Sequence, residues 1–509
     1  MKRSLPLLLL ALAPPVMFLA GTGQVWEDFF ITFRHSLNLV GGHGLTYQAG
    51  ERLQGFSSPL TALLGAACLR ISGLDLERAI LLARLAGALA LAGGAVLLAR
   101  SLRVAGAAGV GFVLPLSLFL LESKNVAFAA NGMETPYALL LLAALQLEVA
   151  RGPRSLRAGA LGAGLMLTRP DAFVPMGGLV LGLLAFPDGP RRRLTRPLLQ
   201  AAVIAFALYL PWLVFAWLYY GSPVPLPILA KAPAGGLAGG LELLAQAPQH
   251  APRVLALLFA PAYAEAGGWP WALLLSLGLG ACGCLAFLWP AAPRHARRLS
   301  VAALFTVVYL AAIPRLYPWY LPVATVLVLP ALGGVFEAAS RIGTRRLLRV
   351  PVSVVASLVL IAAAALLVDY GHLARVTTRL AEGQRREIGR FLSSRVGAAE
   401  RVYLECPGYI GFYSGSRMLD WPGLVSPEVL AARRAGARSL AEAARTLRPE
   451  WLVLRPQEVA GFEALEPDWL ARNYGIVGTF DVRSALRAAL PDHPAVLYDG
   501  AFMVVRRRD

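Results

Sequence analysis

The sequence predicts an α-helical polytopic membrane protein with a soluble α/β domain at its C-terminal end. The chain has 509 residues, of which 57% are hydrophobic and only 15% are charged, a composition far from that of an ordinary soluble domain. The stretches 201–220, 271–289 and 350–368 contain no charged residue, and each approaches the roughly 20 apolar residues that span a bilayer. After Asp369 charged residues become frequent, which indicates a soluble domain.

Further segments are apolar but short, or are interrupted by Gly and Pro. They are 4–20, 57–72, 79–99, 104–121, 126–149, 157–169, 171–187, 299–314 and 318–338. Short or broken helices at membrane depth usually line a cavity within a bundle. Because Pro115 and the polar run at 122–125 can divide 104–149 into more helices, we expect 11 to 13 transmembrane helices. We interpret 4–20 as a retained first helix, since no clean signal-peptide cleavage site follows it.

The excess of basic residues, a net charge of +18, gathers in clusters between hydrophobic segments, at 151–157, 191–196, 294–298 and 341–349. Such clusters mark cytoplasmic loops and contact anionic membrane lipids, so we expect no nucleic-acid partner. The opposite, extracytoplasmic face of the inner (plasma) membrane then holds the loops at 132–135, 169–171, 219–266 and 315–319, and the tail after 369. The acidic pair Glu27 and Asp28 joins them if the N-terminus is cytoplasmic.

The C-terminal part is predicted to be a small α/β domain. Short β-like runs at 401–406, 451–456 and 501–507 alternate with helical patterns. Ser426, Pro427 and Glu428 form the start signal of a helix that we expect to reach about Leu447. The predicted domains are therefore 1–369, a transmembrane domain, and 370–509, an extracytoplasmic α/β domain.

Glu27 and Asp28 lie where the first hydrophobic segment ends. Carboxylates at a membrane boundary are costly unless they have a role, and this pair can remove a proton from a hydroxyl. The alternative is an interfacial helix cap with no chemistry.

No pattern predicts a cofactor or a metal. The four cysteines and six histidines are scattered, without the spacing of a disulfide framework or a zinc site. No Gly-rich phosphate loop follows a strand, which argues against a nucleotide site.

A long motif begins at the acidic pair, where residues 27–64 read EDFFITFRHSLNLVGGHGLTYQAGERLQGFSSPLTALL. Later motifs follow in order: NGMETPYALLLLAAL (131–145), LTRPDAF (167–173), YYGSPVPLPILAK (219–231), RLYPWYLP (315–322) and GYIGFYSGSRMLDWPGLVSPEV (408–429). Together they are spread along most of the chain, from residue 27 to residue 429, and resemble bacterial membrane glycosyltransferases of the GT-C superfamily, closest to the branch with mycobacterial arabinofuranosyltransferases. The usual Asp-Asp pair of that branch is Glu27-Asp28 here, so the resemblance does not fix which carboxylate acts.

The resemblance implies sugar transfer from a polyprenyl-phosphate carrier to an extracytoplasmic acceptor, which we expect to be an envelope glycan, glycolipid or glycoprotein. The lipid phosphate is already a leaving group, so the reaction needs a base and cations rather than a nucleotide. We predict single displacement with inversion, with Asp28 as the base and Glu27 as helper or substitute.

Basic residues on the same face are candidates to bind the donor phosphate, because Arg and Lys stabilise the charge on a departing phosphate. Lys231 and Arg315 are the leading candidates, and their alternative role is snorkelling to the interface. Arg34 lies seven residues after Glu27, on the same face if the loop begins as a helix. It can orient the carboxylates or bind phosphate. Arg52 has a weaker claim, and either arginine can instead be a structural ion-pair member.

The remaining candidates are assigned to substrate binding. His43 can donate a hydrogen bond to substrate or be a structural turn residue. Glu134, Arg169 and Asp171 can recognise the sugar or acceptor, or form a mutually satisfied structural pair. Trp319 and Tyr320 are sugar platforms or members of the aromatic belt.

Two rival functions remain open at this point. A transporter or flippase for a lipid-linked sugar also uses broken helices and intramembrane charges, although convincing inverted repeats are lacking here. A non-catalytic envelope scaffold is the second rival.

Overall fold

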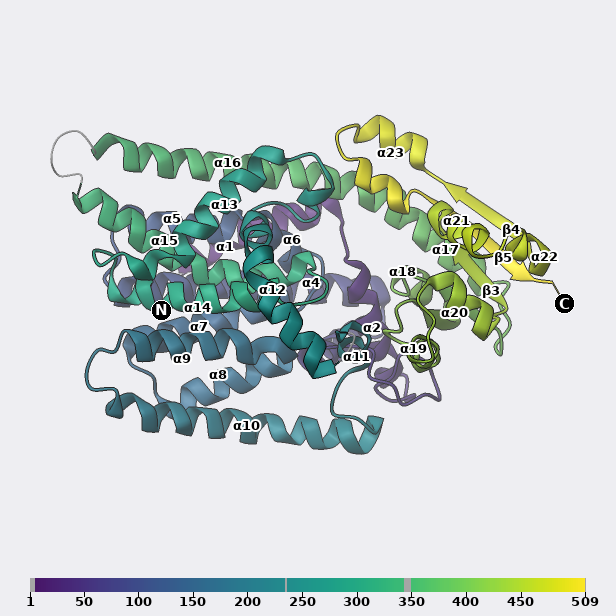
Figure 1. Cartoon of the computed structure of the whole chain (residues 1–509), viewed down its shortest axis with the longest axis horizontal. Coiled ribbons are helices and arrows are strands. Elements are labelled where there is room, and N and C mark those ends of the chain that lie inside the picture. Colours follow the sequence, from purple (N-terminus) through teal and green to yellow (C-terminus); the bar gives the residue numbers. More distant parts are fainter. Residues whose placement is uncertain (1–4, 234–235, 343–348, 509) are drawn as a thin grey trace. The chain divides into compact units, whose positions relative to one another are not determined.

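The computed structural model describes residues 5–233, 236–342 and 349–508, and the chain divides into two compact units (Figure 1). The helical unit comprises Met1–Gly21, Leu81–Leu213 and Pro233–Gly371. The mixed unit comprises Thr22–Ile80, Val214–Ala232 and His372–Asp509. The mixed unit thus includes two segments that the sequence-based division into 1–369 and 370–509 leaves with the membrane helices. That division stays a prediction.

The helical unit is built from helices of different lengths, some of which extend into the mixed unit. They are α1 (Leu5–Thr22), α4 (Leu76–Val104), α5 (Val110–Leu121), α6 (Ser123–Ala130), α7 (Thr135–Arg151), α8 (Ser155–Thr168), α9 (Phe173–Ala185), α10 (Arg192–Tyr220), α12 (Gly236–Leu257), α13 (Pro270–Cys284), α14 (Arg294–Ala311), α15 (Leu321–Ile342) and α16 (Arg349–Thr377). Glycine allows helices α9 and α14 to pack closely against each other. A Cβ at Gly182 of α9 would lie 2.3 Å from the carbonyl oxygen of Arg298 in α14, so only glycine lets these two backbones approach so closely.

The polytopic helical fold is confirmed, whereas helices of full spanning length are fewer than predicted. Among the described residues, five helices are long and apolar enough to cross a membrane, or six if the bent pair α5 and α6 is one span. The predicted segments 57–72, 171–187 and 271–289 form shorter apolar helices, Pro59–Ile71, Pro170–Ala185 and Pro270–Cys284. The expected 11 to 13 spans are therefore not reached by length and apolarity alone, because Gly and Pro end several helices early.

The break within 104–149 falls at one of the two expected positions. Pro115 lies inside α5, and the chain bends by 46° between α5 and α6 at Glu122, the first residue of the polar run. The side chain of Glu122 accepts a hydrogen bond from the backbone N–H of Asn125 and so begins α6.

Of the predicted basic cluster at 341–349, Arg345 and Arg346 lie outside the described residues.

The mixed unit is built around one five-stranded sheet. The strands are β1 (Arg401–Leu404), β2 (Arg417–Asp420), β3 (Trp451–Leu454), β4 (Tyr474–Asp481) and β5 (Ala501–Arg507), in the order β2-β1-β3-β5-β4. Strand β1 pairs in parallel with β2 and β3, while β5 pairs antiparallel with β3 and β4. The helices are α2 (Glu27–Val40), α3 (Pro59–Ile71), α11 (Leu226–Lys231), α17 (Gly383–Ser393), α18 (Tyr409–Ser414), α19 (Pro427–Arg434), α20 (Leu440–Leu447), α21 (Pro456–Leu465), α22 (Trp469–Asn473) and α23 (Arg483–Ala489).

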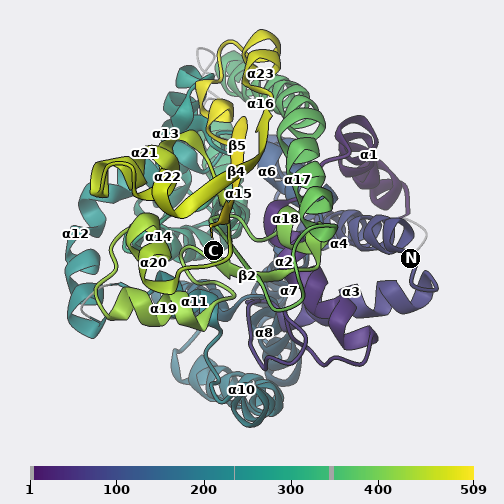
Figure 2. The same cartoon turned by 90° about the vertical axis from the view of Figure 1, so that its right-hand side faces the viewer.

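Both faces of the sheet are covered, as alternation along a strand requires. Val402 and Leu404 of β1 pack with α17, α18 and Ile31 of α2, whereas Tyr403 packs on the opposite side with α20, α21 and α22. Figure 2 shows α17 and α18 on one side of the sheet and α20 to α22 on the other. The start of the chain thus contributes α2 to the core of the sheet domain.

The predicted strands at 401–406, 451–456 and 501–507 are confirmed as β1, β3 and β5. Strands β2 and β4 were not predicted. The single helix expected from Ser426 to Leu447 is wrong: α19 ends at Arg434, Gly436 has a φ of +116°, and α20 begins after Ser439, whose side chain caps it. The left-handed conformation at Gly436 ends the first helix.

Candidate functional site: two buried charge networks

Glu27 and Asp28 form the first turn of α2. Trp26 precedes them in an extended conformation and makes no side-chain cap, so the helix starts with its acidic residues near the positive end of its dipole. Asp28 is half-buried, and the Glu27 side chain is only 17% exposed. The pair therefore has the helix-start position that the structural alternative requires, and chemistry must be judged from its contacts.

Both oxygens of the Glu27 carboxylate are engaged within the mixed unit. Oε1 accepts hydrogen bonds from the backbone N–H groups of Gly408 at 2.7 Å and Tyr409 at 3.2 Å, where α18 begins. Oε2 lies 3.5 Å from Nη1 of Arg385 in α17. A Cβ at Gly408 would come within 2.2 Å of the Glu27 carbonyl oxygen, so this approach needs glycine. Glu27 thereby ties α2 to α17 and α18.

Beyond Glu27, charged side chains of alternating sign continue within the mixed unit. Arg385 is paired with Asp499 at 2.5 Å, and Asp499 is paired with Nε of Arg455 at 2.7 Å. The side chain of Arg455 is 2% exposed and also contacts Glu405 at 3.0 Å and Glu458 at 2.8 Å. We call these residues, together with Glu27, the Glu27 network. The two arginines hold the pKa of Asp499 below its ordinary value even though burial raises it.

Burial dominates the electrostatics of Glu27. Removal from water raises the pKa of its carboxyl to about 7, because the lowering effects of Arg385 and the Gly408 N–H are smaller, and the neighbouring Asp28 adds a further rise. Near neutral pH this carboxyl therefore exchanges a proton with little cost.

Arg34 also binds α18 and the turn after it. Its Nη1 donates to the carbonyl oxygen of Gly411 at 2.7 Å, and its Nη2 donates to those of Ser416 at 2.9 Å and Gly415 at 3.2 Å. Its guanidinium lies 4.3 Å from the ring centroid of Tyr47. Glu27 and Arg34 thus hold the same short helix, as their seven-residue spacing on one face of α2 allows. This geometry favours a positioning role for Arg34.

The other candidates in the mixed unit lie outside the Glu27 network as defined above. Lys231 is the half-buried last residue of α11. His43 is exposed in the turn after α2, and Arg52 is exposed with its guanidinium 5.2 Å from the ring centroid of Tyr219. In the helical unit, Arg315 is exposed and its Nη1 lies 3.5 Å from the hydroxyl of Tyr317.

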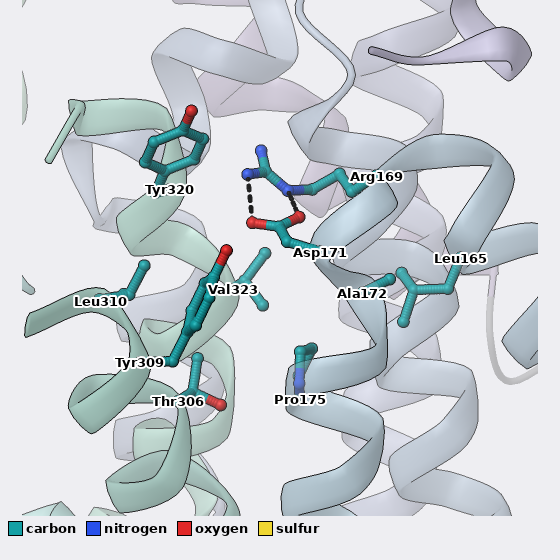
Figure 3. Close-up of a pocket in the computed structure, with 10 residues that line it drawn as sticks. All are labelled: Leu165, Arg169, Asp171, Ala172, Pro175, Thr306, Tyr309, Leu310, Tyr320 and Val323. Atoms are coloured by element: carbon teal, nitrogen blue, oxygen red, sulfur yellow. Dashed lines mark hydrogen bonds and ion pairs between the residues drawn. The ribbon is translucent and has the colours of Figure 1, made fainter. Parts of the chain in front are cut away.

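Five sequence-predicted residues meet in the helical unit. Arg169 forms a bidentate pair with Asp171, with both N–O distances 3.0 Å (Figure 3). Its Nη1 also lies 3.0 Å from Oε1 of Glu134. The same Nη1 donates to the carbonyl oxygen of Trp319 at 3.3 Å, and the guanidinium lies 4.9 Å from the ring centroid of Tyr320. We call these five residues the Arg169 cluster. Three loops that the sequence places on one membrane face therefore converge on one buried guanidinium.

A narrow cavity opens beside the Arg169 cluster. It is lined by Arg169, Asp171 and Tyr320 together with Tyr309 and apolar side chains from α8, α14 and α15. Figure 3 shows the hydroxyl end of Tyr309 pointing toward Asp171. The cavity therefore combines charged and hydroxyl groups with a mostly apolar lining.

Sequence reasoning missed Arg385, Arg455 and Asp499. The only local signal was the position of Arg455 directly after a hydrophobic strand pattern, because nothing in a single sequence links residues more than 40 positions apart. Within the part of the chain that the structure describes, no group of three or more His, Cys, Asp and Glu side chains is arranged to hold a metal ion. The expected absence of a metal stays a prediction.

Two solved structures are similar to this chain over nearly its whole length. ArnT from Cupriavidus metallidurans bound to undecaprenyl phosphate matches with a TM-score of 0.56 and 14% identity, over 98% of this chain and 97% of that chain. Its apo state matches with a TM-score of 0.54 at the same identity and coverage. This chain has the GT-C fold. The fold predicted from the sequence motifs is therefore confirmed. An identity of 14% supports a shared fold and nothing further.

Further comparisons add less. A mutant of the arabinofuranosyltransferase AftD from Mycobacteria matches with a TM-score of 0.43 and 15% identity, over 98% of this chain and 41% of that chain. Residues 374–498 match a family model described as a domain of unknown function, DUF8728. No curated protein matches this chain.

We predict that Glu27→Gln gains thermal stability relative to the wild-type protein as pH rises. The folded-state pKa of the Glu27 carboxyl is raised from 4.5 to about 7. Its contribution to the free energy of unfolding is therefore fully present below pH 4.5 and is lost as pH rises through 7. At pH 8 the wild type lacks about 3 kcal/mol of it, whereas Gln does not titrate and still accepts the two backbone hydrogen bonds. The Tm difference, variant minus wild type in detergent, should be more positive at pH 8 than at pH 5.

The control for this measurement is Glu265→Gln, which removes an exposed carboxylate paired with Arg253. Its Tm difference should be small at both pH values. A Glu27→Gln difference that becomes more negative toward pH 8 would show that the ion pair with Arg385 outweighs burial.

We predict that Asp171→Asn lowers the Tm by several degrees. The substitution leaves the buried Arg169 with one carboxylate instead of two, and a buried charge that loses a partner costs about 3 kcal/mol. The matched control is Asp75→Asn, because Asp75 forms an exposed pair with Arg78 and caps α4, a role that Asn fills equally well. Equal Tm changes in both variants would contradict a structural role for the Arg169 cluster.

Proposed function

We propose that this protein is a glycosyltransferase that moves a sugar from a polyprenyl-phosphate carrier to a hydroxyl group of an extracytoplasmic cell-envelope acceptor. The observation that carries the proposal is the match along nearly the whole chain to ArnT, which was solved with undecaprenyl phosphate bound. The acidic pair at the start of α2 adds a group suited to general-base chemistry. A multi-pass position in the inner membrane, with the sheet domain outside, belongs to the same proposal.

Asp28 is the general base in this mechanism. A base must lie within hydrogen-bonding reach of the proton it removes, and geometry comes before pKa in choosing it. The pKa of Glu27 suits a base, but its two oxygens are engaged by Gly408, Tyr409 and Arg385. Glu27 therefore supports α2 and the orientation of Asp28, the next residue along.

The reaction is a single displacement. The carboxylate of Asp28 takes the proton of the acceptor hydroxyl as its oxygen forms a bond to C1 of the sugar. The bond from C1 to the phosphate oxygen breaks, and its electron pair stays on the polyprenyl phosphate. Attack opposite the leaving group inverts the configuration at C1.

Lys231 and Arg315 stabilise the negative charge that develops on the phosphate. Arg315 is exposed and Lys231 is half-buried, so both have access to solvent. Arg34 donates to three backbone carbonyl oxygens and holds α18, so we assign it to positioning. The Arg169 cluster, His43 and Arg52 are proposed to bind sugar or acceptor.

Turnover by purified protein with a panel of radiolabelled polyprenyl-phosphate sugars and envelope acceptors tests this assignment. Asp28→Asn should lower kcat by about 10²- to 10⁴-fold, the usual contribution of general-base catalysis, with donor binding retained. Glu27→Gln should lower kcat less, because the Gln side chain keeps the hydrogen bonds to α18. Glu265→Gln serves as the charge-matched control, and the Tm of each variant is measured at the assay pH, so that a loss of folded protein is told apart from a loss of kcat.

Full turnover in Asp28→Asn would contradict its role as base. Donor binding without transfer by the wild-type protein, unchanged in both variants, would favour a carrier of lipid-linked sugars or a scaffold.

A further inference from the structure

An open groove lies between the N-terminal ends of α8 and α10 in the helical unit. Its lining includes Ser155 and Leu156 of α8 and Arg192, Arg196 and Leu199 of α10. The two helices run beside each other in Figures 1 and 2. A Cβ at Gly159 would lie 2.6 Å from Cβ of Ile204, so the helices touch at this glycine and the groove opens toward their N-terminal ends.

The groove joins two kinds of surface. Arg192 and Arg196 are exposed at its polar end, where the hydroxyl of Ser155 also donates to the side-chain oxygen of Gln200 at 3.0 Å. Beyond them, Leu156 is 69% exposed, Leu199 62% and Val203 67%. A ligand that fills the groove therefore needs an anionic end and an apolar body.

Nearby carboxylates pair with other arginines. Glu148 lies 3.9 Å from Arg157, and Asp188 is paired with Arg294 and Arg298. The groove thus stays strongly basic, within the two arginine clusters at 151–157 and 191–196.

The apolar surface has the length of a lipid chain in one leaflet. Leu199, Val203, Phe206 and Leu210 follow one another at helical spacing along α10, and all four are exposed. From Leu199 to Leu210 the helix rises about 16 Å, close to half of the roughly 30 Å hydrocarbon core. A free anion would gain nothing from this stripe, whereas a membrane lipid would cover it.

We propose that this groove binds one anionic glycerophospholipid, with its phosphate between Arg192 and Arg196 and an acyl chain along Leu199 to Leu210. The lipid belongs to the leaflet on the face that the arginine clusters predict to be cytoplasmic. This site is separate from the residues assigned to sugar transfer, so it stands whether or not the protein is a transferase.

Native mass spectrometry of the full-length protein in detergent tests the site. The probes are dioleoylphosphatidylglycerol, dioleoylphosphatidylcholine with the same chains, and glycerol 3-phosphate as the headgroup anion alone. The wild-type protein should retain one phosphatidylglycerol in preference to phosphatidylcholine, and glycerol 3-phosphate should not compete at equal concentration.

The double variant Arg192→Gln/Arg196→Gln should bind phosphatidylglycerol about 30-fold more weakly, from the loss of two interfacial cations. The matched control is Arg191→Gln/Arg193→Gln, which removes the same charge at the start of α10 from residues that do not line the groove. It should weaken binding less than about threefold, because only the diffuse attraction falls. All four arginines are exposed, and Tm is measured for each variant.

A second variant tests the apolar part. Leu199→Asn keeps both arginines and should still weaken retention of phosphatidylglycerol, because it interrupts the apolar stripe. Equal losses in the two double variants, or equal retention of the two phospholipids by the wild-type protein, would overturn the proposal. Competition by glycerol 3-phosphate would replace the lipid with a small anion and overturn it as well.

Discussion

The Glu27 carboxylate, buried against the first N–H groups of α18, is the contact on which the mixed unit depends. It joins residues 381 positions apart in the chain, and it needs a glycine at 408 because any side chain there would collide with Glu27. Together with Arg34, which donates to three carbonyl oxygens in and after α18, this contact fixes the start of α2 relative to α17 and α18. The orientation of Asp28, the proposed base, therefore depends on a group that does no chemistry itself.

Buried charges set the rest of the arrangement. Taking an ion out of water costs several kcal/mol, so the buried charges of the Glu27 network and the Arg169 cluster are matched by opposite charges or by backbone groups. In the mixed unit Arg385, Asp499 and Arg455 alternate in sign, and in the helical unit Arg169 holds Asp171 and Glu134. Such networks fix geometry more than they add stability, and a site that aligns a hydroxyl with a glycosyl-phosphate bond needs fixed geometry.

Local patterns predicted the features that local physics controls. Uncharged apolar runs predicted the helical fold, alternating strands predicted β1, β3 and β5, and the polar run at 122–125 predicted the break before α6. For Glu134, Arg169 and Asp171 the sequence left two alternatives, ligand recognition and a mutually satisfied structural pair, and the structure brings the three side chains together. Long-range pairs had no such signal. Arg385 and Asp499 are 114 positions apart, β2 and β4 are held by their neighbours in the sheet, and the end of α19 depends on one left-handed glycine.

The configuration of the transferred sugar tests direct displacement at the lipid-linked donor. Purified wild-type protein is incubated with a polyprenyl-phosphate sugar of known anomeric configuration and an acceptor, and the new glycosidic bond is assigned by NMR. Attack by an acceptor hydroxyl deprotonated by Asp28 predicts an inverted configuration at C1 in every product molecule. Retention would exclude attack opposite the leaving group and would contradict a single displacement in which Asp28 is the general base.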